Sequence, residues 1–176
     1  MKASMMWMGG KLTHPLDGLT ELKTLMGRAS EAVATEGPGE GWEPMVVVAS
    51  DSELRSGVFS FNTRDEKAAI YKHIGQMARK MDAKWAVLVV EAWMVRAPHD
   101  MPAEEAHKVV PADHPQRVTC VRGALFEPTR LVRMELREYV ETSVEGKPVM
   151  VEMKRMDMSK GECEWNYPEL LWGRPE

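Results

Sequence analysis

Apolar side chains recur at helical spacing in two stretches of the chain, and signals for helix ends flank both stretches. The first stripe lies between Pro15, which suits a first helical position, and Gly37, which suits a stop. It predicts a helix over residues 15–35. Thr63 and Glu66 then form a capping box, whose side chains can accept hydrogen bonds from the first backbone N–H groups of a helix. The helix that follows is expected to bury one apolar stripe: Ile70, Ile74, Met77 and Met81.

Shorter runs of apolar and β-branched residues indicate strands. Residues 45–49 and 57–61 are expected to pair antiparallel. Residues 85–95 are apolar on both faces, which is typical of a central strand. Residues 98–116 contain four prolines and read as a long loop, with room for a short helix near Pro102. Three further strands are expected at 117–126, 130–140 and 149–154.

The expected order is therefore helix, strand, strand, helix, strand, long loop and three strands. Closely spaced strands after the second helix favour antiparallel connections. The pattern predicts an α+β fold, in which a mixed and mostly antiparallel sheet carries two main helices packed on one face. One domain is expected over residues 1–160, and an acidic, aromatic C-terminal tail over residues 161–176.

Composition and charge exclude several classes of protein. The 176 residues carry a net charge of −4, so there is no domain-wide basic surface for nucleic acid. Two cysteines, Cys120 and Cys163, are too few for a disulfide framework and favour a reduced, cytoplasmic protein. Cys120 is expected to be a small buried hydrophobe rather than a thiolate. The longest apolar run is too short to cross a bilayer, so no membrane association is expected.

Glu91 lies inside the most apolar strand, where a carboxylate is costly unless it is paired or neutralised. One hypothesis makes it a general acid or base, or a metal ligand. The favoured hypothesis pairs it with an arginine of a neighbouring strand, which would be Arg117, Arg122 or Arg133. A third leaves it partly hydrated through the twist of the sheet.

Three histidines, His99, His107 and His114, lie in one loop among acidic residues. Neutral imidazole is a common metal ligand, but the spacing matches no zinc motif. Exposed loop histidines are therefore expected, with no metal and no cofactor. If these histidines do converge on Glu91, the chain would be a metal-dependent hydrolase, which is the alternative function.

A group of arginines is the main concentration of positive charge: Arg117, Arg122, Arg130, Arg133 and Arg137. On one sheet face they could hold phosphates or an acidic partner, which gives a second alternative, a nucleic-acid accessory protein. Interleaved glutamates favour cross-strand ion pairs on a solvated face instead. Within residues 130–140, Val132, Met134 and Leu136 are expected on one face, and Arg133, Glu135 and Arg137 on the other.

Methionine is abundant, with 15 residues, and methionine-rich surfaces suit adaptable protein contacts. The tail adds large apolar side chains flanked by acids, which is typical of a docking segment. It either packs back on its own sheet or docks on a second copy. The residues concerned are Trp165, Tyr167, Leu170, Leu171 and Trp172.

Residues 90–95 (Val-Glu-Ala-Trp-Met-Val), followed by a proline-containing loop and residues 114–117 (His-Pro-Gln-Arg), resemble a pattern in uncharacterised small proteins of bacteria and their phages. The resemblance covers residues 45–126 and implies such an origin and one α/β-type domain, with no activity attached. It also implies that Glu91, Trp93 and Arg117 belong to the signature of this pattern, with a contact expected between Glu91 and Arg117. The leading hypothesis is a noncatalytic protein that self-associates or binds a protein partner.

Overall fold

The computed structural model describes residues 3–37, 42–96, 98, 100–106, 108, 113–141, 148–157 and 170–173. Seven strands in these ranges form one sheet in the order β1-β3-β2-β4-β5-β6-β7, and every neighbouring pair is antiparallel. The strands are β1 (Ser4–Lys11), β2 (Met45–Ala49), β3 (Glu53–Ser60), β4 (Trp85–Met94), β5 (Val118–Glu127), β6 (Arg130–Glu141) and β7 (Pro148–Asp157). The helices are α1 (Gly18–Glu36), α2 (Arg64–Lys80) and the short α3 (Ala103–Ala106). The α+β class predicted from the sequence is confirmed.

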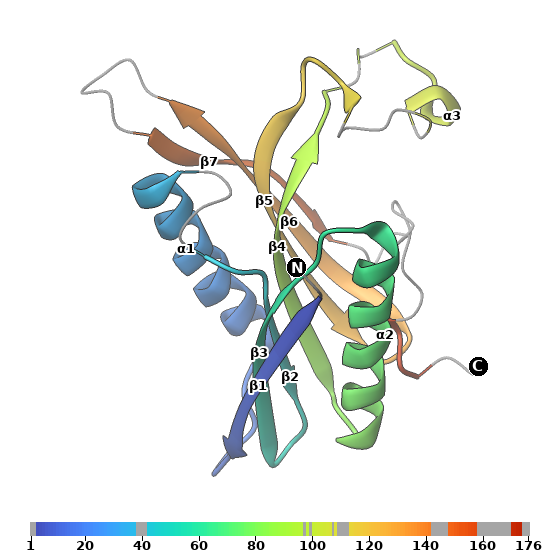
Figure 1. Cartoon of the computed structure of the whole chain (residues 1–176). Coiled ribbons are helices and arrows are strands. Elements are labelled where there is room, and N and C mark those ends of the chain that lie inside the picture. The colour runs from blue at the N-terminus through green and yellow to red at the C-terminus, as the bar shows by residue number, and fades with distance from the viewer. Residues whose placement is uncertain are drawn as a thin grey trace.

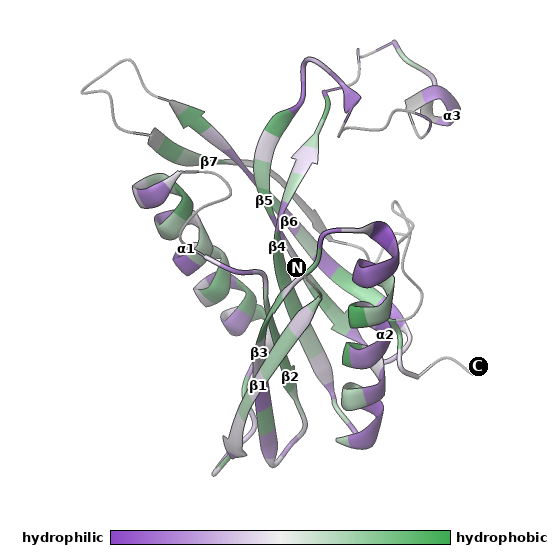
Figure 2. Cartoon of the chain, in the orientation of Figure 1, coloured by the Kyte–Doolittle hydropathy of each residue, from purple (hydrophilic) through white to green (hydrophobic). Residues whose placement is uncertain are grey.

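The two long helices stand on opposite sides of the sheet (Figure 1). Alternate residues of β4 belong to two separate cores, as expected of a strand buried on both faces. Val87 and Val89 pack with α1, whereas Ala86, Leu88 and Val90 pack with α2. The expected placement of both helices on one face is therefore corrected, because an apolar central strand needs cover on both sides. Figure 2 shows polar residues on the outward sides of both helices.

Local capping chemistry sets where the long helices begin. The carboxylate of Asp17 accepts hydrogen bonds from the backbone N–H and the hydroxyl of Thr20, at 3.0 and 2.7 Å, and these bonds lower the pKa of Asp17. α1 therefore begins three residues after Pro15. At α2, the Thr63 hydroxyl accepts from the Glu66 N–H at 3.1 Å, as predicted. The Glu66 carboxylate accepts from the N–H of Asn62, one residue before the cap.

β1 is a strand that the sequence reading did not predict. It joins the sheet at one end by pairing with β3 in a regular register, from Ser4 opposite Ser60 to Lys11 opposite Glu53. Its Met5 and Trp7 side chains pack against the core on the α2 side. β1 therefore extends the sheet beyond the strands expected from the pattern.

Part of the segment expected to be a tail packs in the core of the same chain. Leu170, Leu171 and Trp172 are buried on the α2 side of the sheet. The Trp172 indole N–H donates to the carbonyl of Ala83 at 3.2 Å, and Arg79 donates to the Trp172 carbonyl at 3.0 Å. Leu170, Leu171 and Trp172 therefore pack in the core of their own chain, which was the first of the two hypotheses, and do not dock on a second copy. Trp165 and Tyr167 lie outside the described residues.

Within the described part of the chain, no helix combines the length and the apolar character needed to cross a membrane.

The prediction for Cys120 is confirmed, since this free cysteine is buried on β5. Burial raises the pKa of its thiol to about 11, which keeps the sulfur protonated and unreactive.

Candidate functional site

The β1 end of the sheet is only partly covered on the α1 side. The most numerous contacts of α1 with the sheet are to β4, β5 and β7 (Figure 1). On β2, Val47 is still buried in the core that α1 forms, at 3% exposure, whereas the side chains of β1 on this face are exposed. The register aligns apolar side chains in rows across β1, β3 and β2. Together they form what we call the methionine face: Met6, Met8, Met45, Val47, Leu54 and Val58. Met6 and Met8 are the most exposed of these, at 63% and 67%.

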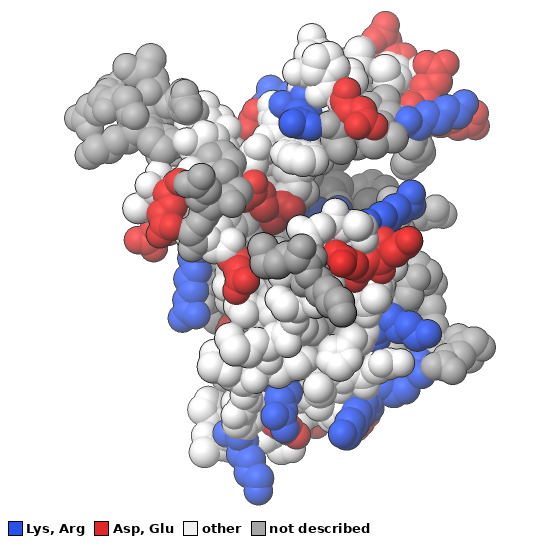
Figure 3. Space-filling model, in the orientation of Figure 1, with Lys and Arg blue, Asp and Glu red and all other residues white. Residues whose placement is uncertain are grey.

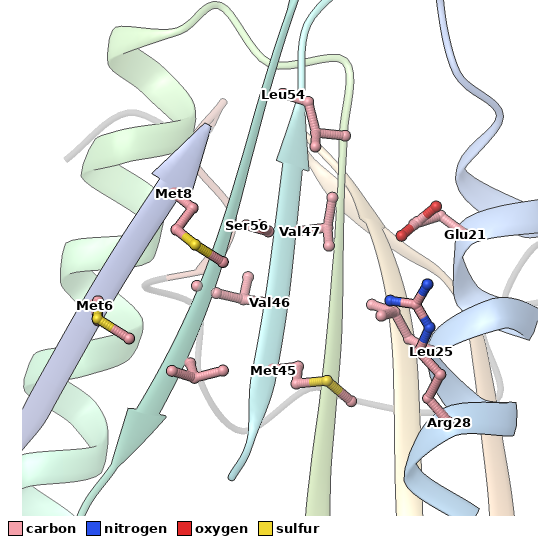
Figure 4. Close-up of a pocket in the computed structure, with 12 residues that line it drawn as sticks. Met6, Met8, Glu21, Leu25, Arg28, Met45, Val46, Val47, Leu54 and Ser56 are labelled. Carbon is pink, nitrogen blue, oxygen red and sulfur yellow. The ribbon is translucent and has the colours of Figure 1, made fainter. Parts of the chain in front are cut away.

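A groove of about 310 Å³ lies between the methionine face and α1, and Val47 is buried against the helix at its base. Figure 4 shows the strands as its floor and Glu21, Leu25 and Arg28 of α1 as its wall. The two charged residues of the groove, Glu21 and Arg28, lie on the helix. The floor consists of methionine and branched aliphatic side chains, and Ser56 is its polar residue. Such a surface favours apolar contact with a partner, because burying it removes apolar area from water.

The methionine face continues to an open edge of the sheet. β1 pairs with β3 on one side and, among the described residues, with no strand on the other. Its sequence, SMMWMGGK, carries one charge, at Lys11, and its pairing shows no bulge. Edge strands are ordinarily protected by charges, proline or bulges, since their exposed backbone groups can pair with another strand. β1 has this protection only at its last residue.

β1 is nevertheless held firmly in place. Trp7 donates from its indole N–H to Nε2 of His73 on α2, at 3.2 Å. The Trp7 ring covers Gly57 on β3, where a Cβ would lie 3.0 Å from the ring. The hydroxyls of Ser4 and Ser60 are 2.9 Å apart and share a hydrogen bond. The edge is thus presented as a preformed strand, which lowers the entropic cost of pairing.

The surface over β1 and β3 is largely uncharged. Figure 3 shows it as the white area in the lower half of the view, with Lys and Arg gathered toward its lower end. At that end Lys11 lies opposite Glu53, and Glu53 accepts a hydrogen bond from Arg55 at 2.7 Å. An approaching partner therefore meets an apolar surface with little charge to desolvate.

Glu91 lies half-buried on the α1-side face of β4, opposite Val121 of β5. Arg122 lies opposite Val90, so it belongs to the other face of the sheet. Arg117 stacks over the Trp93 ring, with its guanidinium carbon 4.2 Å from the ring centre. Trp93 and Glu91 are two residues apart on one strand face, which places Trp93, Glu91 and Arg117 in one region. The ion pair between Glu91 and Arg117 stays a prediction.

The expected histidine group is described only in part. The Nδ1 atom of His114 accepts from the backbone N–H of Gln116 at 3.1 Å, so this ring stabilises a local turn. His99 and His107 lie outside the described residues. Within the part of the chain that the structure describes, no three His, Cys, Asp or Glu side chains are grouped closely enough to hold a metal ion.

The arginines of β5 and β6 are divided between the two faces of the sheet. Arg122 lies on the α2 side, whereas Arg137 lies on the α1 side and donates to the hydroxyl of Ser30 on α1 at 3.1 Å. Glu135, beside Arg137, is 1% exposed. The expected solvated face of β6 is therefore corrected, because α1 covers its charged row.

A bulge also changes which side chains of β6 share a face. The register between β5 and β6 shifts at Leu125 and Phe126. As a result Val132 packs against the α1-side core, while Met134 lies opposite Ala124 of the α2-side core. The expected grouping of Val132 with Met134 is wrong for this reason.

Glu138 is a buried carboxylate that the sequence reading did not single out as a site. It lies on β6 opposite Cys120 and forms an ion pair with Arg96. Its side chain is 12% exposed, whereas that of Arg96 is 67% exposed. The pair therefore fixes the chain just after β4 to the sheet, which is a structural role.

The exposed methionines of β1 were also missed as site residues. The signal was the alternation of Met5, Met6, Trp7 and Met8, which places two apolar side chains on each face of an extended segment.

Comparison of the chain with family models, with curated proteins and with solved structures finds no match. The resemblance of residues 45–126 to small bacterial and phage proteins therefore stays a prediction.

Proposed function

We propose that this chain is a noncatalytic protein that self-associates by pairing β1 with β1 of a second copy. The observation that carries the proposal is the open β1 edge bordered by Met6 and Met8, which are 63% and 67% exposed. Pairing would continue the sheet through the interface and cover both methionines. Main-chain hydrogen bonds would supply affinity, and the side chains would supply register.

A second copy suits this edge because β1 is complementary to itself in an antiparallel arrangement. A two-fold axis at Trp7 places Met6 opposite Met8 of the second copy, and Met8 opposite Met6. Both exposed thioethers then gain an apolar neighbour. Isologous contacts of this kind close after two copies, so the expected product is a dimer.

The same register separates the charges of β1. Each Lys11 lies opposite Ala3 of the other copy, so the two lysines are about 27 Å apart along the ladder at 3.4 Å per residue. That separation exceeds the distance of about 8 Å over which charges act at physiological ionic strength. The two Lys11 side chains therefore do not repel each other across the pairing.

Sedimentation equilibrium over a range of concentrations tests the proposal. The wild-type chain is expected to reach twice 19.9 kDa. Met8→Lys places a charge on the edge and is expected to return the chain to monomers. Val151→Lys is the matched control, because Val151 is 46% exposed on β7 at the other edge, and it should leave the dimer intact. A wild-type monomer at high micromolar concentration would contradict the proposal.

A further inference from the structure

Met6 and Met8 differ from the other methionines of the described residues in their exposure to solvent. They are 63% and 67% exposed, whereas Met26 and Met134 are buried, at 0% and 7%. The remaining methionines in the described ranges are half-buried. A reagent dissolved in water therefore meets the thioethers of Met6 and Met8 more readily than those of the other described methionines.

The structure of β1 keeps these two thioethers on the open face. Successive side chains of a strand point to opposite faces, so Met5 and Trp7 pack against the core on the α2 side. Met6 and Met8 line the groove beside α1 instead. The pairing of β1 with β3 and the hydrogen bond from Trp7 to His73 fix this arrangement. Both exposed sulfur atoms thus lie at the edge where the second copy is proposed to pair.

We infer that Met6 and Met8 are an oxidation site through which a peroxide controls the pairing of β1. The inference rests on the proposed function, because it concerns regulation of the same edge. A lone pair of the thioether sulfur attacks one oxygen of hydrogen peroxide, so an S–O bond forms and the O–O bond breaks. The transferred oxygen gives up its proton to the departing hydroxide, which leaves as water. Sulfur is oxidised to the sulfoxide, and the peroxide is reduced.

Oxidation changes an apolar side chain into a polar one at the centre of the proposed interface. In the antiparallel arrangement each sulfoxide of Met6 lies opposite Met8 of the second copy, which has no hydrogen-bond donor in its side chain. Burying a polar oxygen without a donor is costly, whereas the monomer leaves it in water. Four sulfoxides for each dimer are expected to raise the dissociation constant by about a hundredfold or more. Because the side chains are exposed in the monomer, its fold is expected to be unchanged.

Partial oxidation of the wild-type chain tests the inference without any substitution. The protein is treated with hydrogen peroxide, held near its dissociation constant and separated into monomer and dimer by size-exclusion chromatography. Peptide mass spectrometry then measures the sulfoxide at each methionine. Sulfoxide at Met6 and Met8 is expected to be enriched about tenfold or more in the monomer. Sulfoxide at the half-buried Met77 and Met101, which lie away from β1, should be equal in both fractions. Equal content at Met6 and Met8 would overturn the inference.

Reduction of the sulfoxides distinguishes a reversible site from general damage. Treatment of the oxidised monomer with methionine sulfoxide reductases and a thiol is expected to restore both thioethers and the dimer. A reduced chain that stays monomeric would contradict the inference.

The two proposals fail in different ways. A chain that is monomeric before any oxidation contradicts the proposed function, and with it the regulation. A dimer whose dissociation constant is unchanged when Met6 and Met8 are fully oxidised contradicts the regulation alone.

Discussion

The two edge strands of the sheet, β1 and β7, differ in how they are protected. β7 begins at Pro148, its sequence carries Glu152, Lys154, Arg155 and Asp157, and its pairing with β6 shifts register at Leu136 and Arg137. β1 has no proline, no bulge and a single terminal charge. Proline, charge and bulges are the features by which proteins prevent unwanted strand pairing. These features are concentrated at β7, and the proposed pairing of β1 rests on their near absence at β1.

The same contrast extends into the sheet on the α1 side. Beneath α1, the strands near β7 are packed so closely that a Cβ on Gly123 would lie 2.4 Å from the sulfur of Met26. On β1, a Cβ on Gly10 would meet nothing within 4 Å. One end of the sheet is therefore a filled core, and the other is a surface with apolar side chains. The two ends can be compared by the same substitution.

The largest expected effect is on the free energy of unfolding, when Gly123 and Gly10 are each replaced by valine. Gly123→Val forces a branched side chain against Met26 and Leu22, so we expect it to lower the free energy of unfolding by about 2–3 kcal/mol. Gly10→Val adds a side chain in open space, and we expect a change within about 0.5 kcal/mol. Urea unfolding of both variants measures the difference. Equal destabilisation would show that the β1 end is as closely packed as the other.

A smaller effect is expected from removing the exposed apolar side chains at each edge. Met6→Ser combined with Met8→Ser should raise the dissociation constant of the dimer by about thirtyfold, from about 2 kcal/mol of lost apolar burial. Val149→Ser combined with Val151→Ser removes exposed side chains from β7 and should leave the dissociation constant unchanged. Dilution experiments by light scattering compare the two. If both double variants raised the dissociation constant by a similar factor, the dimer interface would not lie at β1.

The smallest expected effect is in hydrogen exchange, without any substitution. Raising the protein concentration should slow exchange of the outward-facing amides of β1 by about tenfold or more, as they become hydrogen-bonded across the interface. Amides of β7 should exchange at the same rate at every concentration. Protection that rises at β7 instead would reverse the roles of the two edges.

Features set by neighbouring residues were predictable from the sequence. The capping box at Thr63 and Glu66 needs only contacts within one turn, and it forms at the start of α2 as expected. The central position of β4 follows from its apolar residues on both faces, and the structure confirms it. Cys120 is buried because its position inside an apolar strand decides its surroundings.

Features that depend on distant parts of the chain were not predictable in this way. The face that α1 covers is set by packing, and the charged row with Glu135 and Arg137 gave no sign that a helix lies over it. β1 was missed because glycine has a weak strand preference, and because the paired residues of β3 lie 42 to 56 residues further along the chain. Without β1, the methionine face and the open edge could not be recognised.

The central claim, that β1 pairs antiparallel with its copy, is tested most directly by two doubly charged variants. Each replaces Met6 and Met8, so each loses the same apolar contacts. In the first variant, Met6→Lys with Met8→Lys, each lysine lies opposite a lysine of the second copy, so like charges face each other. In the second variant, Met6→Lys with Met8→Glu, each lysine lies opposite a glutamate of the second copy, so opposite charges face each other. Sedimentation equilibrium should find the first variant monomeric and the second dimeric. Identical dissociation constants for the two variants would contradict the pairing.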